Sequence, residues 1–336
     1  MSAVKFKLTL NPKQSKYQIG YQDKIVLIGS CFSENIGIKF TNFQWDVLEN
    51  PHGVLFNPVS VQNSIQDCIE HKKYTKDDLF LLNDVWNSWH HHSRFSGITQ
   101  QEALDKMNAS VEKSHYFLKN ANHIIITLGS AWLYRLSEQA PQGEGQVVAN
   151  NHKAPANWFN KELMQPLVLI KLLQELIQSL QAFNPNLNIV FTISPVRHLR
   201  EGLIENNRSK AVLIQAVHQV LSEKGKVGYF PAYEYIIDDL RDYRFYSEDL
   251  VHPNYAATQY VWEQFVASYM NDATQSIMKQ VAELQLAVNH KPFFVGSSAH
   301  QLFLQSCINK TEQLLAAHPY LPLTNQLAFF KRQVAK

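Results

Sequence analysis

Three short runs of aliphatic residues, each ending in a polar or glycine-containing turn, constrain the fold of this chain most strongly. They span residues 25–28, 124–128 and 189–193, and a shorter run at 227–230 has the same character. Continuous rather than alternating hydrophobicity is typical of strands buried on both faces of a parallel sheet. We therefore expect these runs to be neighbouring strands of one parallel sheet.

Amphipathic helical patterns separate the apolar runs, at residues 59–71, 101–119, 162–183 and 208–223. Alternation of strand and helix predicts βαβ units, an α/β fold with helices on both faces of the sheet. Residues 42–57 and 133–160 have no clear periodicity, so we expect long loops there. Long loops in a compact domain are often functional, and in an open parallel sheet they gather at the carboxyl ends of the strands.

The character of the chain changes after residue 272. Residues 273–290 and 297–317 have helical patterns, and no further strand is predicted. We therefore expect an α/β domain over residues 1–272 and a helical C-terminal extension over residues 273–336. The extension can pack on the core, form a homodimer interface or cover the site, and the sequence leaves all three open.

Charge and composition argue against polyanionic partners. The chain has 31 basic and 29 acidic residues and no long basic run, which favours neither nucleic acid nor an anionic membrane as a partner. The N-terminus lacks the apolar core of a signal peptide, and no stretch approaches the roughly 20 apolar residues of a membrane span. Three widely spaced cysteines make a disulfide framework unexpected. We expect a soluble, cytoplasmic protein.

A candidate nucleophile follows the first apolar run, in the sequence IVLIGSCFS. We expect a strand, a tight turn and then a helix that includes residues 34–40. A side chain at such a junction projects above the sheet, and the helix N-terminus stabilises negative charge on an oxyanion or a thiolate. Ser30 and Cys31 are both candidates. Alternatively, Ser30 caps the helix and Cys31 is a small buried hydrophobic residue.

A candidate base lies near the end of the α/β region, in the sequence SEDLVHPN. Asp249 and His252 are three residues apart, and Pro253 and Asn254 open a predicted helix at 255–270. In such a turn the Asp249 carboxylate can reach Nδ1–H of His252, which leaves Nε2 free to act as a general base.

Further candidates lie in two other segments. His90, His91 and His92 follow one another, so at most two of them can converge, which is too few for a metal site. Either one of these histidines, for which we name His91, lines the substrate pocket, or the segment is a polar loop anchored by the buried side chains of Trp86 and Trp89. Arg197 and His198 follow the third apolar run and should lie at the active edge, where Arg197 can bind an anionic group or pair with a loop acid.

A third segment attracts no catalytic hypothesis. Asn206, Arg208 and Lys210 are interpreted as solvated or capping residues at the start of a helix. No metal and no cofactor is expected from the sequence as a whole.

Together these segments resemble the GSCFA family, which is related to the SGNH (GDSL-like) hydrolases. The resemblance covers roughly residues 20–265 and rests on GSCFS, NPHGVLFNP, SWHHHSRFSG, TLGSAWLYR, SPVRHLREGLIENNRSK and DLVHPN. It implies a flavodoxin-like three-layer α/β/α sandwich and hydrolysis or transfer of an acyl group.

Placed on the SGNH blocks, this chain has its nucleophile at Cys31 and its Asp-x-x-His at Asp249 and His252. The oxyanion glycine of the second block falls on Gly53, and the third block falls on Gly129, Ser130 and Ala131. Two departures follow. A cysteine replaces the usual serine, and Ala131 replaces an asparagine that donates to the oxyanion. The Ser130 hydroxyl or the Asn57 side chain is expected to compensate.

The leading hypothesis is therefore an esterase-like or thioesterase-like acyl hydrolase, or an acyltransferase, with a Cys31–His252–Asp249 triad and a small-molecule acyl or ester substrate. Ser30 is the alternative nucleophile. A second hypothesis is a ligand-binding protein that has kept the fold and lost turnover, for which Ala131 is the best support. A metal-dependent hydrolase built on the histidine run is a third and weaker hypothesis.

Overall fold

The computed structural model describes residues 8–221 and 226–334. Its centre is a five-stranded sheet in which every neighbouring pair is parallel. The strands lie in the order β2 (Val47–Glu49), β1 (Ile25–Gly29), β5 (His123–Leu128), β8 (Asn188–Ile193) and β9 (Val227–Tyr229). This is the order of flavodoxin-like folds, so the predicted parallel sheet is confirmed.

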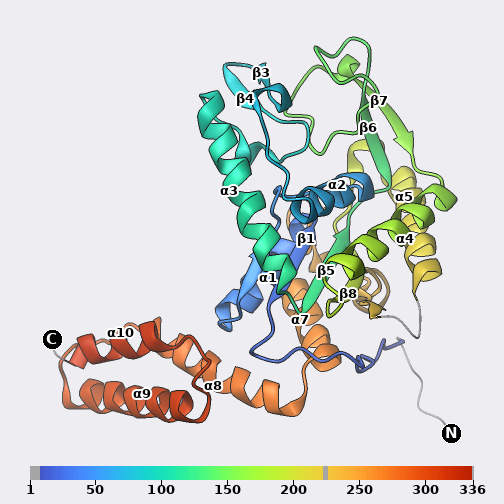
Figure 1. Ribbon diagram of the computed structural model, residues 1–336. Helices are drawn as coiled ribbons and strands as arrows, with labels where there is room; N and C mark the ends of the chain where they lie inside the picture. Colours follow the sequence, from blue (N-terminus) through green and yellow to red (C-terminus); the bar gives the residue numbers. More distant parts are fainter. Residues whose placement is uncertain (1–7, 222–225, 335–336) are drawn as a thin grey trace, which may run out of the picture.

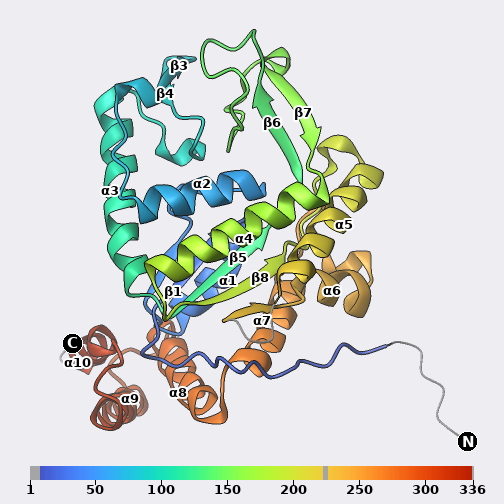
Figure 2. The same cartoon turned by 45° about the vertical axis from the view of Figure 1, so that its right-hand side comes forward.

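Helices cover both faces of the sheet, as predicted (Figure 2). One face packs against α2 (Pro58–Ile69), α3 (Gln100–Lys119), α4 (Pro166–Phe183) and α5 (Leu203–Val220). The other packs against α1 (Cys31–Asn42), α6 (Ala232–Glu234), the π-helical segment Tyr235–Leu240 and α7 (Tyr255–Tyr269). Successive side chains of β1 point to opposite faces of the sheet. Val26 and Ile28 therefore pack in the apolar core on one face, and Ile25 and Leu27 pack in the core on the other.

Several regions predicted as loops contain short strands. Strand β2 lies within residues 42–57. Residues 133–160 lie in a hairpin whose strands are β6 (Trp132–Leu136) and β7 (Phe159–Leu163), joined by a long connection. Because β7 extends to Leu163, α4 begins at Pro166 rather than at residue 162. A second hairpin pairs β3 (Phe80–Leu82) with β4 (Val85–Asn87). Both hairpins project beyond one end of the central sheet (Figure 1).

Other boundaries differ by a few residues. Helix α5 begins at Leu203 rather than at residue 208, and its predicted end at 223 lies outside the described residues. Short 3₁₀ turns complete the connections, at Lys76–Asp78, Ser93–Phe95, Ala156–Trp158, Leu199–Glu201 and Tyr243–Phe245. No helix in the described part of the chain is both long enough and apolar enough to span a bilayer.

The C-terminal extension is helical, as predicted, and has an additional helix. It consists of α8 (Asp272–Val288), α9 (Ser298–Ala317) and α10 (Thr324–Val334), which share an apolar cluster around Val281, Leu304 and Phe330. Helix α7 starts at the carboxyl ends of the strands and leads to α8 at the opposite end of the sheet (Figure 1). The extension therefore does not cover the carboxyl edge.

The junction between β1 and α1 is the tightest point of this architecture. Gly29 has a φ of +132°, and a Cβ at this position would lie 2.0 Å from the carbonyl oxygen of Thr127 on β5. The Gly29 N–H donates to Oδ1 of Asn50 at 2.8 Å, and its carbonyl accepts from Leu55 N–H. Only glycine fits this contact, because the backbones of the two strands touch where the chain turns.

We predict that Gly29→Ala costs more than about 3 kcal/mol of unfolding free energy, because backbone strain and a clash with backbone atoms add together. Gly145→Ala is the matched control. Gly145 also has a positive φ, +76°, but nothing lies within 4 Å of its Cβ position, so only about 1–2 kcal/mol of strain is expected. Urea unfolding measures both, and equal costs would contradict the close-approach account.

Candidate active site

Ser30 and Cys31 stand at the N-terminus of α1. Ser30 is the N-cap: it is fully buried, and its Oγ accepts the N–H of Phe32 at 3.2 Å. Cys31 is the first helical residue and is partly exposed. The helix thus begins at Cys31, and the structure gives Ser30 the capping position that is the alternative to a nucleophile.

Several features of the site shift the pKa of the Cys31 thiol in opposite directions. Burial raises its pKa above the ordinary value, and the carboxylate of Glu34 adds to this increase. The N–H groups of Cys31 and Phe32 and the charge of Lys210 lower the pKa, but by less. Desolvation therefore outweighs the stabilisation of a thiolate that we expected from the helix N-terminus. A nucleophilic Cys31 needs a base.

Asp249 and His252 make the predicted contact. Oδ2 of Asp249 lies 2.6 Å from Nδ1 of His252, and Oδ1 accepts the N–H groups of Val251 at 2.9 Å and His252 at 3.0 Å. These bonds to the charged form lower the pKa of Asp249 to about 2. Both side chains are 48% exposed. The carboxylate thus orients the imidazole through Nδ1 and leaves Nε2 as the nitrogen that can act as a base.

Arg197 ties the Asp249–His252 loop to the carboxyl end of β8. Its backbone N–H donates to the carbonyl of Val251 at 3.2 Å, and its Nη1 donates to the carbonyl of Leu250 at 3.1 Å. The guanidinium stacks 4.1 Å above the ring of Tyr246. Arg197 therefore positions this loop. Its guanidinium contacts a backbone carbonyl and an aromatic ring, rather than a loop carboxylate or an anionic group.

His198 lies between this loop and the end of β5. A Cβ on Gly129 would be 3.0 Å from Nε2 of His198, and that nitrogen is buried without a partner. Burial and the charges of Lys210 and His252 lower the pKa of His198 to about 3, so the ring is neutral. His198 thus borders the carboxyl end of β5, next to the point between β1 and β5 where the strand order of the sheet reverses.

Other predicted donors are engaged elsewhere. The N–H groups of Gly129 and Ser130 both donate to the carbonyl of Phe56 at 2.9 Å, and Ser130 Oγ accepts the N–H of Trp132. Ala131 is fully buried, and its N–H donates to Ser209 Oγ at 2.7 Å. The Ser130 hydroxyl also lies 3.2 Å from Ser209 Oγ, so the third block is held by hydrogen bonds within the protein.

Three further predicted residues do not line an open site. The Gly53 N–H is used in a turn, where it donates to the carbonyl of Asn50 at 2.8 Å. Asn57 caps α2 by accepting the N–H of Ser60 at 2.8 Å. His91 is fully buried, with its ring centroid 4.2 Å from that of His52. A turn, a helix cap and a packed core account for these three.

The interpretation of Lys210 as a solvated or capping residue is wrong. The side chain is buried rather than solvated, and its Nζ donates to the carbonyls of Gly129 at 2.6 Å and Ser194 at 2.7 Å. Helical spacing could have found it, because Lys210 follows Asn206 by four residues and precedes Leu213 by three on the buried face of α5. The polar character of this segment concealed that face.

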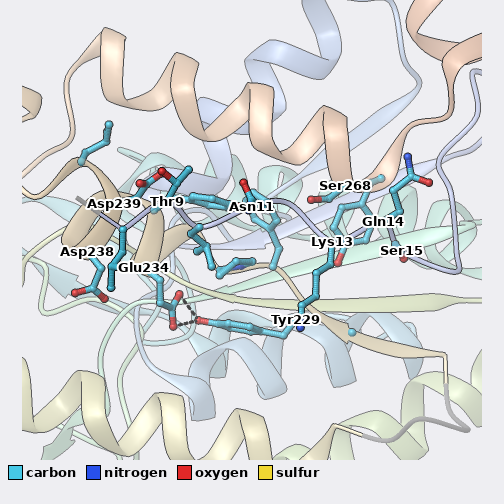
Figure 3. Close-up of a pocket in the computed structure, with 18 of the residues that line it drawn as sticks. Thr9, Asn11, Lys13, Gln14, Ser15, Tyr229, Glu234, Asp238, Asp239 and Ser268 are labelled. Carbon is cyan, nitrogen blue, oxygen red and sulfur yellow. Dashed lines mark hydrogen bonds between the residues drawn. The ribbon is translucent and has the colours of Figure 1, made fainter. Parts of the chain in front are cut away.

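A separate cavity of about 1320 Å³ lies beneath residues 8–15 (Figure 3). Strand β9 and the π-helical segment form its other walls, where Tyr229 donates to Glu234 at 2.8 Å. Its lining contains neither Cys31 nor His252. The cavity is therefore distinct from the candidate active site.

No group of three or more histidine, cysteine, aspartate or glutamate side chains within the described ranges is arranged to hold a metal ion.

The chain is similar in structure to a Clostridium thermocellum family 3 carbohydrate esterase, with 10% identity, coverage of 77% of this chain and 98% of that one, and a TM-score of 0.35. It is also similar to an acetyl xylan esterase from the rumen bacterium Butyrivibrio proteoclasticus, with 11% identity, coverage of 74% and 63%, and a TM-score of 0.37. No curated protein matches its sequence.

Family models match two parts of the chain. The model of the GSCFA family matches residues 24–265, and the model of the GSCFA domain protein C-terminal domain matches residues 281–336. The first match contains every element of the central sheet as well as Cys31, Asp249 and His252. Because it spans most of the sequence, this chain belongs to the GSCFA family.

Proposed function

We propose that this GSCFA protein is an acyl hydrolase that acts on an ester or thioester, with Cys31 as nucleophile and His252 as general base. The observation that carries the proposal is the Asp249–His252 pair, joined at 2.6 Å, on the same sheet edge as a partly exposed cysteine at a helix N-terminus. A nucleophile, a base and a group that orients the base are the parts that acyl transfer requires.

The reaction follows from these positions. Nε2 of His252 takes the thiol proton as the Cys31 sulfur attacks the acyl carbon. The N–H of Cys31, at the free end of α1, stabilises the oxyanion. The leaving group receives the proton from His252, and an acyl thioester remains on Cys31. Water then attacks this thioester with His252 again as the base, and the acid is released with a free thiol. Attack by an acceptor hydroxyl instead of water is acyl transfer.

No hydrogen bond of the described residues joins Cys31 to His252, so the proposed mechanism requires the two side chains to come closer in the substrate complex. Catalytic hydrogen bonds are often long before binding and tighten in the substrate complex. Both side chains of the Asp–His pair are half exposed, and Arg197 and the packing of Val251 and Tyr246 hold the loop that carries them.

A ligand-binding protein without turnover is the second candidate. It is favoured by Ala131, whose buried N–H is satisfied by Ser209 where an oxyanion donor is expected. A panel of p-nitrophenyl esters and acyl thioesters separates the two. Release of product from any of them favours the hydrolase, and saturable binding of acyl compounds without product favours the binder.

Cys31→Ala is expected to abolish ester or thioester turnover, since Ser30, the other candidate at the tip of α1, is fully buried as the helix cap. Ser30→Ala should retain turnover and lose about 1 kcal/mol of stability, because it removes only the helix cap. Steady-state kinetics and urea unfolding measure the two effects. Full activity in Cys31→Ala would sink the assignment, and loss of activity in Ser30→Ala alone would transfer the role to Ser30.

Iodoacetamide is expected to modify Cys31 before the other two cysteines. Cys68 and Cys307 are buried in the core and in the C-terminal cluster, and burial raises the pKa of Cys68 to about 12. Peptide mapping after brief alkylation gives the order of labelling. Equal or earlier labelling of Cys68 would show that Cys31 is not the accessible thiol.

Asp249→Asn is expected to lower kcat by about 10³–10⁴-fold with the loop intact. The amide oxygen can still accept the N–H groups of Val251 and His252, but the amide nitrogen faces Nδ1 and forces the ring proton onto Nε2. Glu248→Gln, an exposed neighbour, is the control and should be neutral. Turnover of Asp249→Asn near that of the wild type would rule out the orienting role.

A further inference from the structure

The cavity beneath residues 8–15 has the size and the lining of a ligand site. Its volume of about 1320 Å³ is more than enough for a drug-sized molecule. Strand β9, the π-helical segment, the end of α7 and residues 8–15 enclose it, and the surface that they present is mostly apolar. A concave, largely apolar space with a few polar groups is the usual form of a small-molecule site.

A glycine in β9 keeps part of this space open. Gly228 is the middle residue of the three-residue strand and lines the cavity. Its surroundings do not require glycine, because a Cβ there would meet the Tyr269 hydroxyl at 3.6 Å, an ordinary contact, and its φ is not positive. Glycine weakens a strand interior and often marks the close approach of a backbone or a ligand. Because no backbone atom lies this close, the ligand is the explanation that fits.

Carboxylates lie toward one end of the cavity, and Lys13 lies toward the other (Figure 3). Glu234 and Asp238 are four residues apart, at the entry to the π-helical segment and within it. This helix type is uncommon and occurs frequently at functional sites. The Tyr229 hydroxyl donates to both carboxylate oxygens of Glu234 at 2.8 Å. That partner is neutral, so the hydrogen bonds leave the charge of Glu234 uncompensated.

The cations of the lining do not pair with these carboxylates. Lys13 is on the roof and Arg241 follows the π-helical segment, and no ion pair within residues 8–221 and 226–334 joins either to Glu234 or Asp238. Burial raises the pKa of Glu234, and the hydrogen bond from Tyr229 opposes this increase. A cation bound beside Glu234 would stabilise its charged form.

We propose that this cavity binds an organic ammonium ion that carries an apolar chain, with the ammonium at Glu234 and the chain between β9 and residues 8–14. Leu8 and Leu10 are 88% and 37% exposed, so apolar surface is available to cover the chain. Ser15 N–H donates to Ser268 at 2.8 Å, but no hydrogen bond among the described residues holds residues 8–14, which leaves a route of entry. The site is separate from the one proposed for ester hydrolysis, whose residues do not line this cavity.

The test is isothermal titration calorimetry of the full-length protein with three probes. Hexyltrimethylammonium carries both the charge and the chain, tetramethylammonium carries the charge alone, and 1-hexanol carries the chain alone. The first is expected to bind at least about tenfold more tightly than either of the others, because only it contacts both the carboxylate and the apolar walls. Equal affinity for hexyltrimethylammonium and 1-hexanol would contradict a cation site.

Glu234→Gln removes the charge and keeps an acceptor for the Tyr229 hydroxyl. It is expected to weaken hexyltrimethylammonium binding about tenfold and to leave 1-hexanol binding unchanged. Glu263→Gln is the matched control, since Glu263 is exposed on α7 and does not line the cavity. Gly228→Leu fills the space beside β9 and should weaken both probes. Urea unfolding verifies that each variant is folded.

A folded Glu234→Gln that binds hexyltrimethylammonium as tightly as the wild type overturns the proposal, as does the absence of saturable binding to the wild type. Binding that is lost on alkylation of Cys31 but retained in Gly228→Leu places the ligand at the candidate active site and also overturns it. If Gly228→Leu does not fold, Glu234→Gln decides alone. Ester turnover is expected to be the same in Glu234→Gln and the wild type, so the result is independent of the proposed function.

Discussion

The contact between the backbones of Gly29 and Thr127 is the constraint on which the site depends. It brings the end of β1 against β5, and the Asn50 side chain and Leu55 hold the turn from the other side. Helix α1 therefore begins at this turn, and its first residue, Cys31, is partly exposed and packs against the core cluster around Phe32. Because β1 and β5 are also the strands between which the order of the sheet reverses, this tight turn opens onto the crevice where α/β proteins bind ligands.

The charged groups at the carboxyl edge of the sheet fall into a solvent-exposed pair and a buried pair. Asp249 and His252 are half exposed on a loop, and the hydrogen bond between Asp249 Oδ2 and His252 Nδ1 holds the two side chains together. Cys31 and Lys210 lie deeper, where desolvation raises the pKa of the thiol and lowers that of the ammonium. Burial works against ionisation of both groups, and their mutual attraction works for it.

The sequence was sufficient to predict the main strands of the central sheet and the Asp249–His252 pair of the candidate site. Buried parallel strands need long apolar runs, so β1, β5 and β8 were predictable, and Asp249–His252 was predictable because its contact is local. Strands such as β2, with three residues, and β7, with the polar sequence FNKEL, carry no such signal and form through pairing with distant partners. The burial of His91 and Lys210 likewise depends on which elements pack over them, and neighbouring residues do not encode that directly.

The central claim is that Cys31 carries the acyl group during turnover. Intact-mass analysis of the protein mixed rapidly with p-nitrophenyl acetate tests it most directly, with peptide mapping to place the adduct. The account predicts one acetyl group on Cys31 in the wild type, accumulation of the same adduct in Asp249→Asn if deacylation becomes limiting, and no adduct in Cys31→Ala. An acetyl group on Ser30, or product release with an unmodified Cys31 at every time point, would contradict it.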